Sequence, residues 1–373
     1  VSRLMRDNNL MLSNQGQKVA YISGQGNLGI YFYSQKESSI YTDENVYWLT
    51  RGRGLRMEVI NGIGPEPTSG EETFSENVHF EDNNYALTGI FNDPNSDYWF
   101  WDYVIAGDPS YETKTFDFNV YGVASNAGNA VLTLNLQGAT NTDADPDHHV
   151  RISINGTEIG ESYWDGLASH TVSLSFNQGI LNEGENTLTV TGLLDSGVEY
   201  SIFYVNYFDL SYQRLYQAGD NKLFCSGDNN HTVTISGFNN SNIYLFDVSN
   251  VLRPKLIRAT TIDNIGSNYR LSFYPVSDNH YLALTTDAVS APVSIMADVP
   301  SKLHSPYNNA DYVMITPSAF KEVIQSLALY RQGQGLSTMV VDLEDIMDEF
   351  NYGISSPEAI QGFLAYAYQY WHS

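Results

Sequence analysis

The chain has 373 residues with 43 acidic and 18 basic side chains, which give a formal net charge of -25 at pH 7. An acidic surface of this size repels nucleic-acid phosphates and anionic lipid, so nucleic acid is excluded as a partner. The single cysteine, Cys225, excludes an internal disulfide framework and a thiolate zinc cluster. No apolar run is long enough to span a bilayer, and we predict no membrane insertion. The length favours two or three domains, each with its own core.

The first 70 residues carry the pattern of a β domain. Short apolar runs, such as residues 19–22 and 30–33, are separated by Gly, Ser and Asn, which is typical of strands joined by turns. Residues 62–70 contain several Gly and Pro and suit a linker. We therefore predict that residues 1–70 are the first part of a β domain.

The next segment has the clearest strand alternation of the chain. In residues 114–120 and 132–136 every second residue is apolar, so one face of each strand is expected to be buried. Asn155 and Gly156 predict a hairpin, because a type I′ turn needs two positive φ angles. Many short antiparallel strands at this spacing predict a jelly-roll β-sandwich over residues 71–215.

Shorter strands resume after the sandwich. Residues 232–235 and 242–248 are examples, and we predict that residues 216–303 complete the β domain begun by residues 1–70. The sandwich is then an insertion in a discontinuous domain. This hypothesis requires that residues 1–65 and 216–300 share a sheet.

The last segment predicts alternating strands and helices. Residues 312–315 form a continuous apolar run of the kind found in buried parallel strands. Thr316 and Pro317 resemble an N-cap followed by proline at the first helical position, and Gly333 or Gly335 is expected to end that helix.

A second strand and helix follow. We predict a strand over residues 336–342 and a final helix that starts at Ser356 and Pro357. The acidic residues of positions 342–349 are interpreted as a solvated helix start. Residues 304–373 are thus expected to form a βαβα unit, whose two strands are fewer than a covered parallel sheet usually has.

Several segments of this unit resemble the opening of the gingipain-like catalytic domain. They are residues 310–317, 329–336, 340–342, 346–353 and 357–364. Three upstream segments are similar to β modules that precede this domain in large bacterial and archaeal surface proteins, namely residues 14–19, 41–50 and 246–249. The fold class implied is multidomain and mainly β, with a jelly-roll-like β-sandwich inserted in a β domain, followed by the first part of a caspase-like α/β domain.

The resemblance also implies a function. It predicts the N-terminal region of a secreted gingipain-like cysteine endopeptidase, in which a histidine activates a thiolate that attacks the scissile carbonyl of a protein or peptide substrate. No histidine here is followed by the glycine of the family motif, and Cys225 lies in the β region. We therefore assign no catalytic residue in this chain and expect the catalytic pair beyond Ser373, so that the chain is truncated within the catalytic domain.

Two stretches have the alternating oxygen-bearing side chains that calcium prefers. They are Asp93, Asn95 and Asp97, and Asp143, Asp145 and Asp147. Neither fits an EF-hand, and solvated acidic loops are the alternative interpretation. The prediction is a structural Ca²⁺ with no cofactor required for activity.

Neighbouring histidines offer a second metal hypothesis. His148 and His149 follow the second acidic stretch, but adjacent residues of a strand point to opposite faces, which weakens a shared transition-metal site. Cys225 is interpreted as a buried structural thiol, because no basic partner is indicated beside it.

Aromatic residues of the sandwich support a rival function. Trp99 and Trp101, joined by Trp164, are a candidate platform for a cell-surface glycan, and ordinary core packing is the alternative. The rival hypothesis is a non-enzymatic surface adhesin or carbohydrate-binding β-sandwich protein. The richness in tyrosine and the scarcity of lysine are typical of extracellular β proteins, so we expect a secreted or cell-surface location in either case.

Overall fold

The computed structural model describes most of the chain, in two compact units. The described residues are 2–24, 29–37, 39, 41–62, 72–89, 97–227, 231–258, 260–276 and 279–371. The first unit comprises residues 1–59, 248–256 and 290–373, and the second comprises residues 60–247 and 257–289. The predicted boundaries at residues 70, 215 and 303 are finer than this division and stay a prediction. Within the described part, no helix has the length and apolarity needed to cross a membrane.

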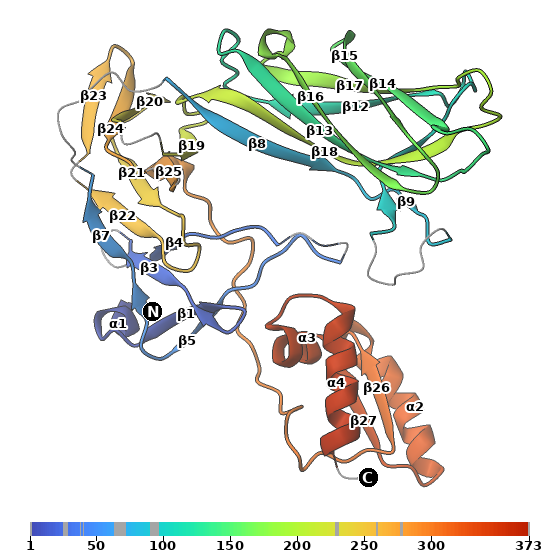
Figure 1. Cartoon of the computed structure of the whole chain (residues 1–373). Coiled ribbons are helices and arrows are strands. Elements are labelled where there is room, and N and C mark those ends of the chain that lie inside the picture. The colour runs from blue at the N-terminus through green and yellow to red at the C-terminus, as the bar shows by residue number, and fades with distance from the viewer. Residues whose placement is uncertain are drawn as a thin grey trace. The chain divides into compact units, whose positions relative to one another are not determined.

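The second unit contains a sandwich of two antiparallel sheets, drawn mainly in green in Figure 1. One sheet has the order β11-β18-β13-β16, with β8 also paired to β18, and the other has the order β12-β17-β14-β15. The strands of the first sheet are β8 (Thr73–Glu81), β11 (Asp102–Ile105), β13 (Asn129–Gly138), β16 (Ser169–Asn177) and β18 (Ile202–Leu215). Those of the second are β12 (Thr113–Val120), β14 (His148–Ile154), β15 (Thr157–Trp164) and β17 (Gly184–Leu193). A 3₁₀ turn, η2 (Gln178–Ile180), and the pair β9 (Tyr85–Ala86) and β10 (Trp99–Phe100) complete it.

Alternation of apolar residues accounts for the sandwich core. In β12 the buried positions are Phe116, Phe118 and Val120, as the period of two predicts. Asn155 and Gly156 have φ angles of 50° and 75°, so the predicted hairpin between β14 and β15 is confirmed. Inward-facing side chains of both sheets form one continuous cluster. The two-sheet architecture is therefore as predicted, while the jelly-roll classification stays a prediction.

A second group of strands in this part of the chain surrounds another core. One sheet has the order β20-β24-β23 and another has the order β19-β25-β21-β22-β7. The strands are β7 (Glu58–Asn61), β19 (Lys222–Ser226), β20 (Val233–Phe238), β21 (Ile243–Asp247), β22 (Lys255–Arg258), β23 (Thr261–Ile265), β24 (Asn268–Phe273) and β25 (His280–Thr285), followed by the turn η3 (Thr286–Ala288). Strand β7 thus lies in one sheet with strands from residues 222–285, which is the arrangement that a discontinuous β domain requires.

The first unit begins with two small sheets and a short helix. Their orders are β2-β1-β5 and β4-β3-β6. The elements are α1 (Ser2–Arg6), β1 (Leu10–Asn14), β2 (Gln17–Lys18), β3 (Ala20–Ser23), β4 (Ile30–Phe32), β5 (Trp48–Arg51) and β6 (Leu55–Arg56). The buried Tyr21 hydroxyl donates a 2.6 Å hydrogen bond to the Leu10 carbonyl. A Cβ at Gly54 would lie 2.1 Å from that carbonyl oxygen, so only glycine fits there.

The same unit ends in an α/β arrangement. Strands β26 (Tyr312–Thr316) and β27 (Thr338–Asp342) pair in parallel, and the helices are α2 (Lys321–Gly333), α3 (Leu343–Asn351) and α4 (Pro357–Tyr370). The apolar faces of α3 and α4 pack on alternate strand residues around Phe363, which is fully buried. Figure 1 shows α2 beside the two strands, on the side away from α4. The predicted strand–helix–strand–helix order is present, and a further helix, α3, lies between β27 and the predicted final helix α4.

The two predicted helix starts have different outcomes. The Ser356 side chain accepts a hydrogen bond from the Glu358 N–H at 3.1 Å and Pro357 is the first helical residue, as predicted. The cap at Thr316 is wrong, because Pro317 has an extended ψ of 148°. A 3₁₀ turn, η4 (Ser318–Phe320), comes first and α2 begins only at Lys321.

Candidate functional site

The carboxyl ends of β26 and β27 form the first candidate region, because parallel sheets bind ligands at this edge. Thr316 and Asp342 lie opposite each other at the two strand ends. Asp342 is only 4% exposed. Its carboxylate accepts hydrogen bonds from the Lys321 Nζ at 2.8 Å, from the Ser318 hydroxyl and from the Glu344 N–H at 3.0 Å. Asp342 thereby joins the start of α2 to the start of α3.

Hydrogen bonding keeps Asp342 and Lys321 ionised. Burial opposes the charged form of Asp342, but the hydrogen bonds from Lys321 and Ser318 outweigh it and lower the pKa of the carboxyl group. The same contact with Asp342 raises the pKa of Lys321. These contacts join the Asp342, Lys321 and Ser318 side chains into one hydrogen-bonded group at this edge.

Helix α3 carries a concentration of carboxylates. Burial raises the pKa of Asp348 to about 6, and Asp298, Glu344, Asp345 and Glu349 add repulsion. Burial also raises the pKa of Asp345. The predicted solvated helix start is thus partly buried and repulsive on the face that carries Asp348.

Replacing Asp348 with asparagine is expected to raise the melting temperature at pH 7.5 and to change it little at pH 4. The folded-state pKa lies above the unfolded value, so the fold binds the extra proton and loses stability as pH rises from about 4 to about 6. After allowance for solvent screening the gain at neutral pH is about 1 kcal/mol. Thermal unfolding across this pH range measures it. Asp311→Asn is the control of opposite sign, because hydrogen bonds from Ser337 lower the pKa of Asp311; a Tm for Asp348→Asn that falls at neutral pH would contradict the account.

Glu349 fixes the segment that leads into β26. Its carboxylate accepts hydrogen bonds from the Ser301 hydroxyl, the Leu303 N–H and the His304 N–H and Nδ1. Burial disfavours the charge, but these hydrogen bonds lower the pKa of Glu349. The His304 ring also stacks on Phe350 at 4.2 Å. His304 is therefore held as a structural side chain.

Cys225 lies in the core, as predicted. The residue is fully buried on β19, and burial raises the pKa of its thiol to about 12. A thiol in this environment is neither ionised nor reachable by a substrate. This placement agrees with assigning it no catalytic role.

The predicted calcium ligands are placed only in part. Asp93 and Asn95 lie outside the described residues. Asp97 is exposed, and its carboxylate accepts hydrogen bonds from the Trp99 N–H and the Asn206 Nδ2, both at 3.1 Å. A structural Ca²⁺ at this loop stays a prediction.

The second predicted calcium stretch is divided between surface and interior. Asp143 and Asp145 are exposed, whereas Asp147 is 2% exposed. The two carboxylate oxygens of Asp147 accept hydrogen bonds from the N–H groups of Thr142 at 2.8 Å and Gly166 at 2.9 Å. Nowhere in the described ranges do three His, Cys, Asp or Glu side chains converge to hold a metal ion. The structure therefore does not bring these three carboxylates together, and the site stays a prediction.

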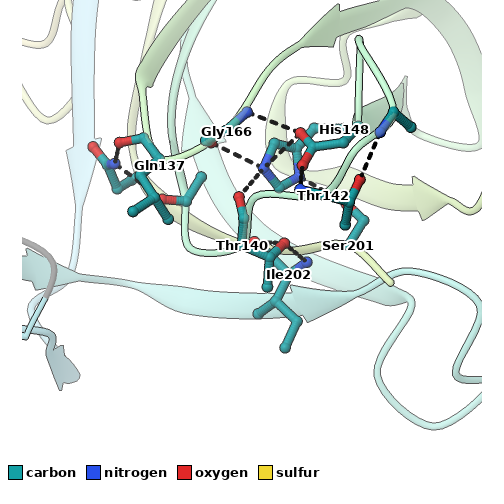
Figure 2. Close-up of polar contacts among 11 residues, drawn as sticks. Gln137, Thr140, Thr142, His148, Gly166, Ser201 and Ile202 are labelled. Atoms are coloured by element: carbon teal, nitrogen blue, oxygen red, sulfur yellow. Dashed lines mark hydrogen bonds and ion pairs between the residues drawn. The ribbon is translucent and has the colours of Figure 1, made fainter. Parts of the chain in front are cut away.

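Figure 2 shows a buried polar network around His148. The His148 Nδ1 lies 2.7 Å from the Ser201 hydroxyl, and its Nε2 faces the carbonyl oxygens of Thr140 and Gly166 at 3.2 and 3.1 Å. Asp147 Oδ1 is 3.5 Å from the same Nε2. The combination resembles a Ser-His-Asp triad in composition.

Burial excludes hydrolysis by this network. His148 and Ser201 are each 1% exposed, so no substrate carbonyl can approach the hydroxyl. A Cβ at Gly138 would lie 2.0 Å from the Gly166 carbonyl oxygen and 2.9 Å from His148 Nε2. The backbone thus packs directly on the network, which ties loops of the sandwich to one another.

The three tryptophans do not form a common exposed platform. Trp101 packs on the core between Phe116 and Phe208, with its ring parallel to that of Phe208 at 5.8 Å. Trp164 is 7% exposed and stacks on His148 at 4.7 Å. Trp99 is half-buried on β10. Core packing, the alternative interpretation, describes Trp101 and Trp164.

Sequence reasoning missed the contacts that hold these regions in place. Ser318, Lys321 and Glu349 carried no distinctive local motif. The sequence did offer one signal for the Asp342 contacts. Ser318 and Lys321 follow the end of one strand, Asp342 ends the next, and adjacent parallel strands end at one edge of the sheet. For Glu349 there was no signal, since its partners lie 45 to 48 positions earlier in the chain.

Comparison with known proteins adds a family likeness for the last part of the chain. Residues 305–373 match the family model described as Peptidase family C25, the gingipain family. The predicted resemblance to gingipain-like cysteine peptidases is therefore confirmed, and the matched residues are those of the βαβα unit.

The particular likeness is to the crystal structure of dimeric latent PorU from Porphyromonas gingivalis. The TM-score is 0.60 at 16% identity, over 97% of this chain and 34% of that chain. At this identity the likeness shows the fold, and it confirms the mainly β class with the start of a caspase-like α/β domain at the C-terminal side. The chain spans about a third of the length of PorU.

Two smaller structures match about a third of the chain. The CBM36-1 domain of a multidomain xylanase from the hindgut metagenome of Trinervitermes trinervoides matches with a TM-score of 0.24 at 14% identity, over 36% of this chain and 96% of that domain. A carbohydrate-binding module CBM36 in complex with calcium and xylotriose matches with a TM-score of 0.23 at 10% identity, over 36% and 98%. No curated protein matches the sequence.

Proposed function

We propose that this chain is the N-terminal region of a secreted gingipain-like cysteine endopeptidase. The observation that carries the proposal is the match of residues 305–373 to family C25, on a segment that folds as a parallel βαβα unit. The histidine and cysteine of the reaction are supplied outside this chain. The histidine activates or ion-pairs the thiol, and the thiolate attacks the carbonyl of a protein or peptide substrate.

The β modules are proposed to support the peptidase domain by chaperoning, anchoring or presenting substrate. Their position ahead of the matched residues is what motivates this role. Deleting residues 1–289 from the complete protein is then expected to reduce its soluble yield or its cleavage of large substrates. If the complete protein folded and cleaved equally well without residues 1–289, the proposed supporting role of the β modules would be contradicted.

The rival function, a surface adhesin or carbohydrate-binding protein, has less support. Two of its three candidate tryptophans, Trp101 and Trp164, are packed in the core. A structural Ca²⁺ and a cell-surface location remain compatible with either function. We propose both for the peptidase, on the acidic loops and the tyrosine-rich composition.

Cleavage of casein by the complete protein tests the proposal. Cleavage is expected without reagent and is expected to be lost after treatment with a thiol-alkylating reagent. The 373-residue chain is the control and is expected to be inactive, because its single cysteine is buried. An inert complete protein, or cleavage that alkylation does not affect, would contradict the proposal.

A further inference from the structure

The C-terminal end of helix α3 has a strained backbone. Tyr352, the residue that ends the helix, has a φ of 57° and a ψ of 27°, and Gly353 after it has a φ of 88°. A residue with a Cβ adopts this left-handed region at a cost, so helices usually place glycine at such an end. A tyrosine held there is expected to make a contact that offsets the strain.

The N-terminal part of the chain supplies a hydrogen bond at this helix end. Trp48, the first residue of β5, donates from its indole Nε1 to the Tyr352 carbonyl oxygen at 2.8 Å. The two residues are 304 positions apart in the sequence, and both belong to the first compact unit. Because the last carbonyl groups of a helix have no partner within it, the indole acts as a cap supplied from a distant strand.

The turn between β1 and β2 lies against the Tyr352 ring. A Cβ added at Gly16 would lie 2.9 Å from the Cε1 atom of Tyr352 and 3.1 Å from its Cζ and hydroxyl oxygen. Gln15 and Gly16 have φ angles of 46° and 74°, as a two-residue hairpin turn requires. The glycine of this turn therefore leaves the room in which the tyrosine ring packs.

A third contact lies beside the other two. A Cβ added at Gly353 would lie 2.9 Å from the Cγ1 atom of Val46, so the backbone after α3 passes close to that side chain. The Asn14 side-chain amide donates hydrogen bonds to the Val46 carbonyl at 3.0 Å and to the Asn45 side-chain oxygen at 2.5 Å. These bonds join the end of β1 to the segment before β5, so the turn and the segment form one surface.

We propose that this surface, residues 14–16 and 46–48, is a docking site for the C-terminal end of α3, and we name it the N-terminal clamp. Its partner is a segment of the same chain. Helices α3 and α4 pack around Phe363, so a clamp on the connection between them stabilises the α/β core. The clamp concerns the folding of this chain and does not depend on the peptidase proposal.

Hydrogen exchange of the 373-residue chain, resolved by peptide mass, tests the clamp from both sides. Trp48→Phe keeps an aromatic ring and removes the N–H donor, so exchange in residues 351–356 is expected to be about fivefold faster. Tyr352→Gly removes the ring but places the preferred residue at the helix end, which by itself slows exchange in α3. Faster exchange in residues 10–18 of this variant is expected only if the ring docks there.

Matched variants separate docking from backbone strain. Gly16→Ala and Gly156→Ala place a Cβ at φ angles of 74° and 75°, but nothing lies within 4 Å of a Cβ at Gly156. Only Gly16→Ala is expected to speed exchange in residues 351–356. Leu49→Ala is the control for Trp48, because the neighbouring Leu49 side chain is 45% exposed.

The opposite result is equally clear. If Trp48→Phe and Gly16→Ala left exchange in residues 351–356 as in the unmodified chain, the proposal would be overturned. It would also be overturned if Gly156→Ala or Leu49→Ala sped that exchange as much.

Discussion

Replacing Phe208 with alanine is expected to lower the free energy of unfolding of the sandwich by about 3–5 kcal/mol. Phe208 on β18 is fully buried. Its ring contacts those of Phe80 at 4.9 Å, Phe118 at 5.4 Å and Trp101 at 5.8 Å. Truncation removes these contacts and leaves a cavity that a rigid pair of sheets cannot close. Domains of this size are stable by only about 5–15 kcal/mol, so the loss is a large fraction.

Denaturant unfolding followed by tryptophan fluorescence measures the effect, because Trp101 reports on the same core. Tyr121→Ala is the control, since that ring is 57% exposed. Its expected change is within about 0.5 kcal/mol. A cost below about 1 kcal/mol for Phe208→Ala would mean that the two sheets do not share the core described.

Replacing Phe363 with alanine is expected to destabilise the α/β unit by a similar amount, about 3–5 kcal/mol. Phe363 on α4 is fully buried, and its ring packs against Phe350 at 5.6 Å and Trp371 at 5.5 Å. Among the described residues, two strands and three helices surround this core. Loss of its central ring is expected to expose the amides of α3 and α4 to solvent.

Hydrogen exchange resolved by peptide mass measures this directly. Faster exchange is expected in α3, α4 and β27, with unchanged exchange in the sandwich strands. Tyr368→Ala on the same helix is the control, because Tyr368 is 94% exposed. If the amide exchange rates of α3, α4 and β27 in Phe363→Ala equalled those of the unmodified protein, the assignment of Phe363 as the centre of this core would be contradicted.

Local chemistry explains which elements were predictable from the sequence. The Asn155–Gly156 turn and the Ser356–Pro357 helix start depend on two adjacent residues, so they could be read without knowledge of the fold. The prediction of a helix N-cap at Thr316 was wrong for a related reason. Proline suits the first helical position, but it equally suits the extended ψ that Pro317 adopts, and only the tertiary fold decides between them.

Side-chain environments depended on contacts between distant strands. Trp101 is in the core because Phe116 and Phe208 lie against it, and Phe208 is 107 positions away in the sequence. Asp147 faces the interior, where its carboxylate accepts a hydrogen bond from the Gly166 N–H. Neither contact can be predicted from the local sequence pattern.

The environment of His149 could not be predicted from the sequence either, because it depends on a β-bulge. A regular two-residue hairpin at Asn155 and Gly156 would have placed Ser162 opposite His149. The one-residue shift at Ile152 instead brings Tyr163 there and turns Glu161 to the same face. A bulge of this kind is decided by packing, such as the close approach of Leu174 to Gly160, where a Cβ would lie 2.7 Å from the Leu174 Cδ2.

The catalytic assignment depended on resemblance rather than on any constellation in the chain. Cys225 and His148 are buried, and His304 is held by Glu349. Within the matched segment, Asp342 joins the start of α2 to the start of α3 through Lys321, Ser318 and Glu344.

Mapping the reactive thiol of the complete protein tests the proposed cysteine-peptidase function. The protein is treated with iodoacetamide under native conditions until casein cleavage stops, and the modified cysteine is identified by peptide mass. We expect one modified cysteine outside residues 1–373, with Cys225 unmodified unless the protein is unfolded. Modification of Cys225 in step with the loss of activity, or full activity with every accessible cysteine alkylated, would contradict it.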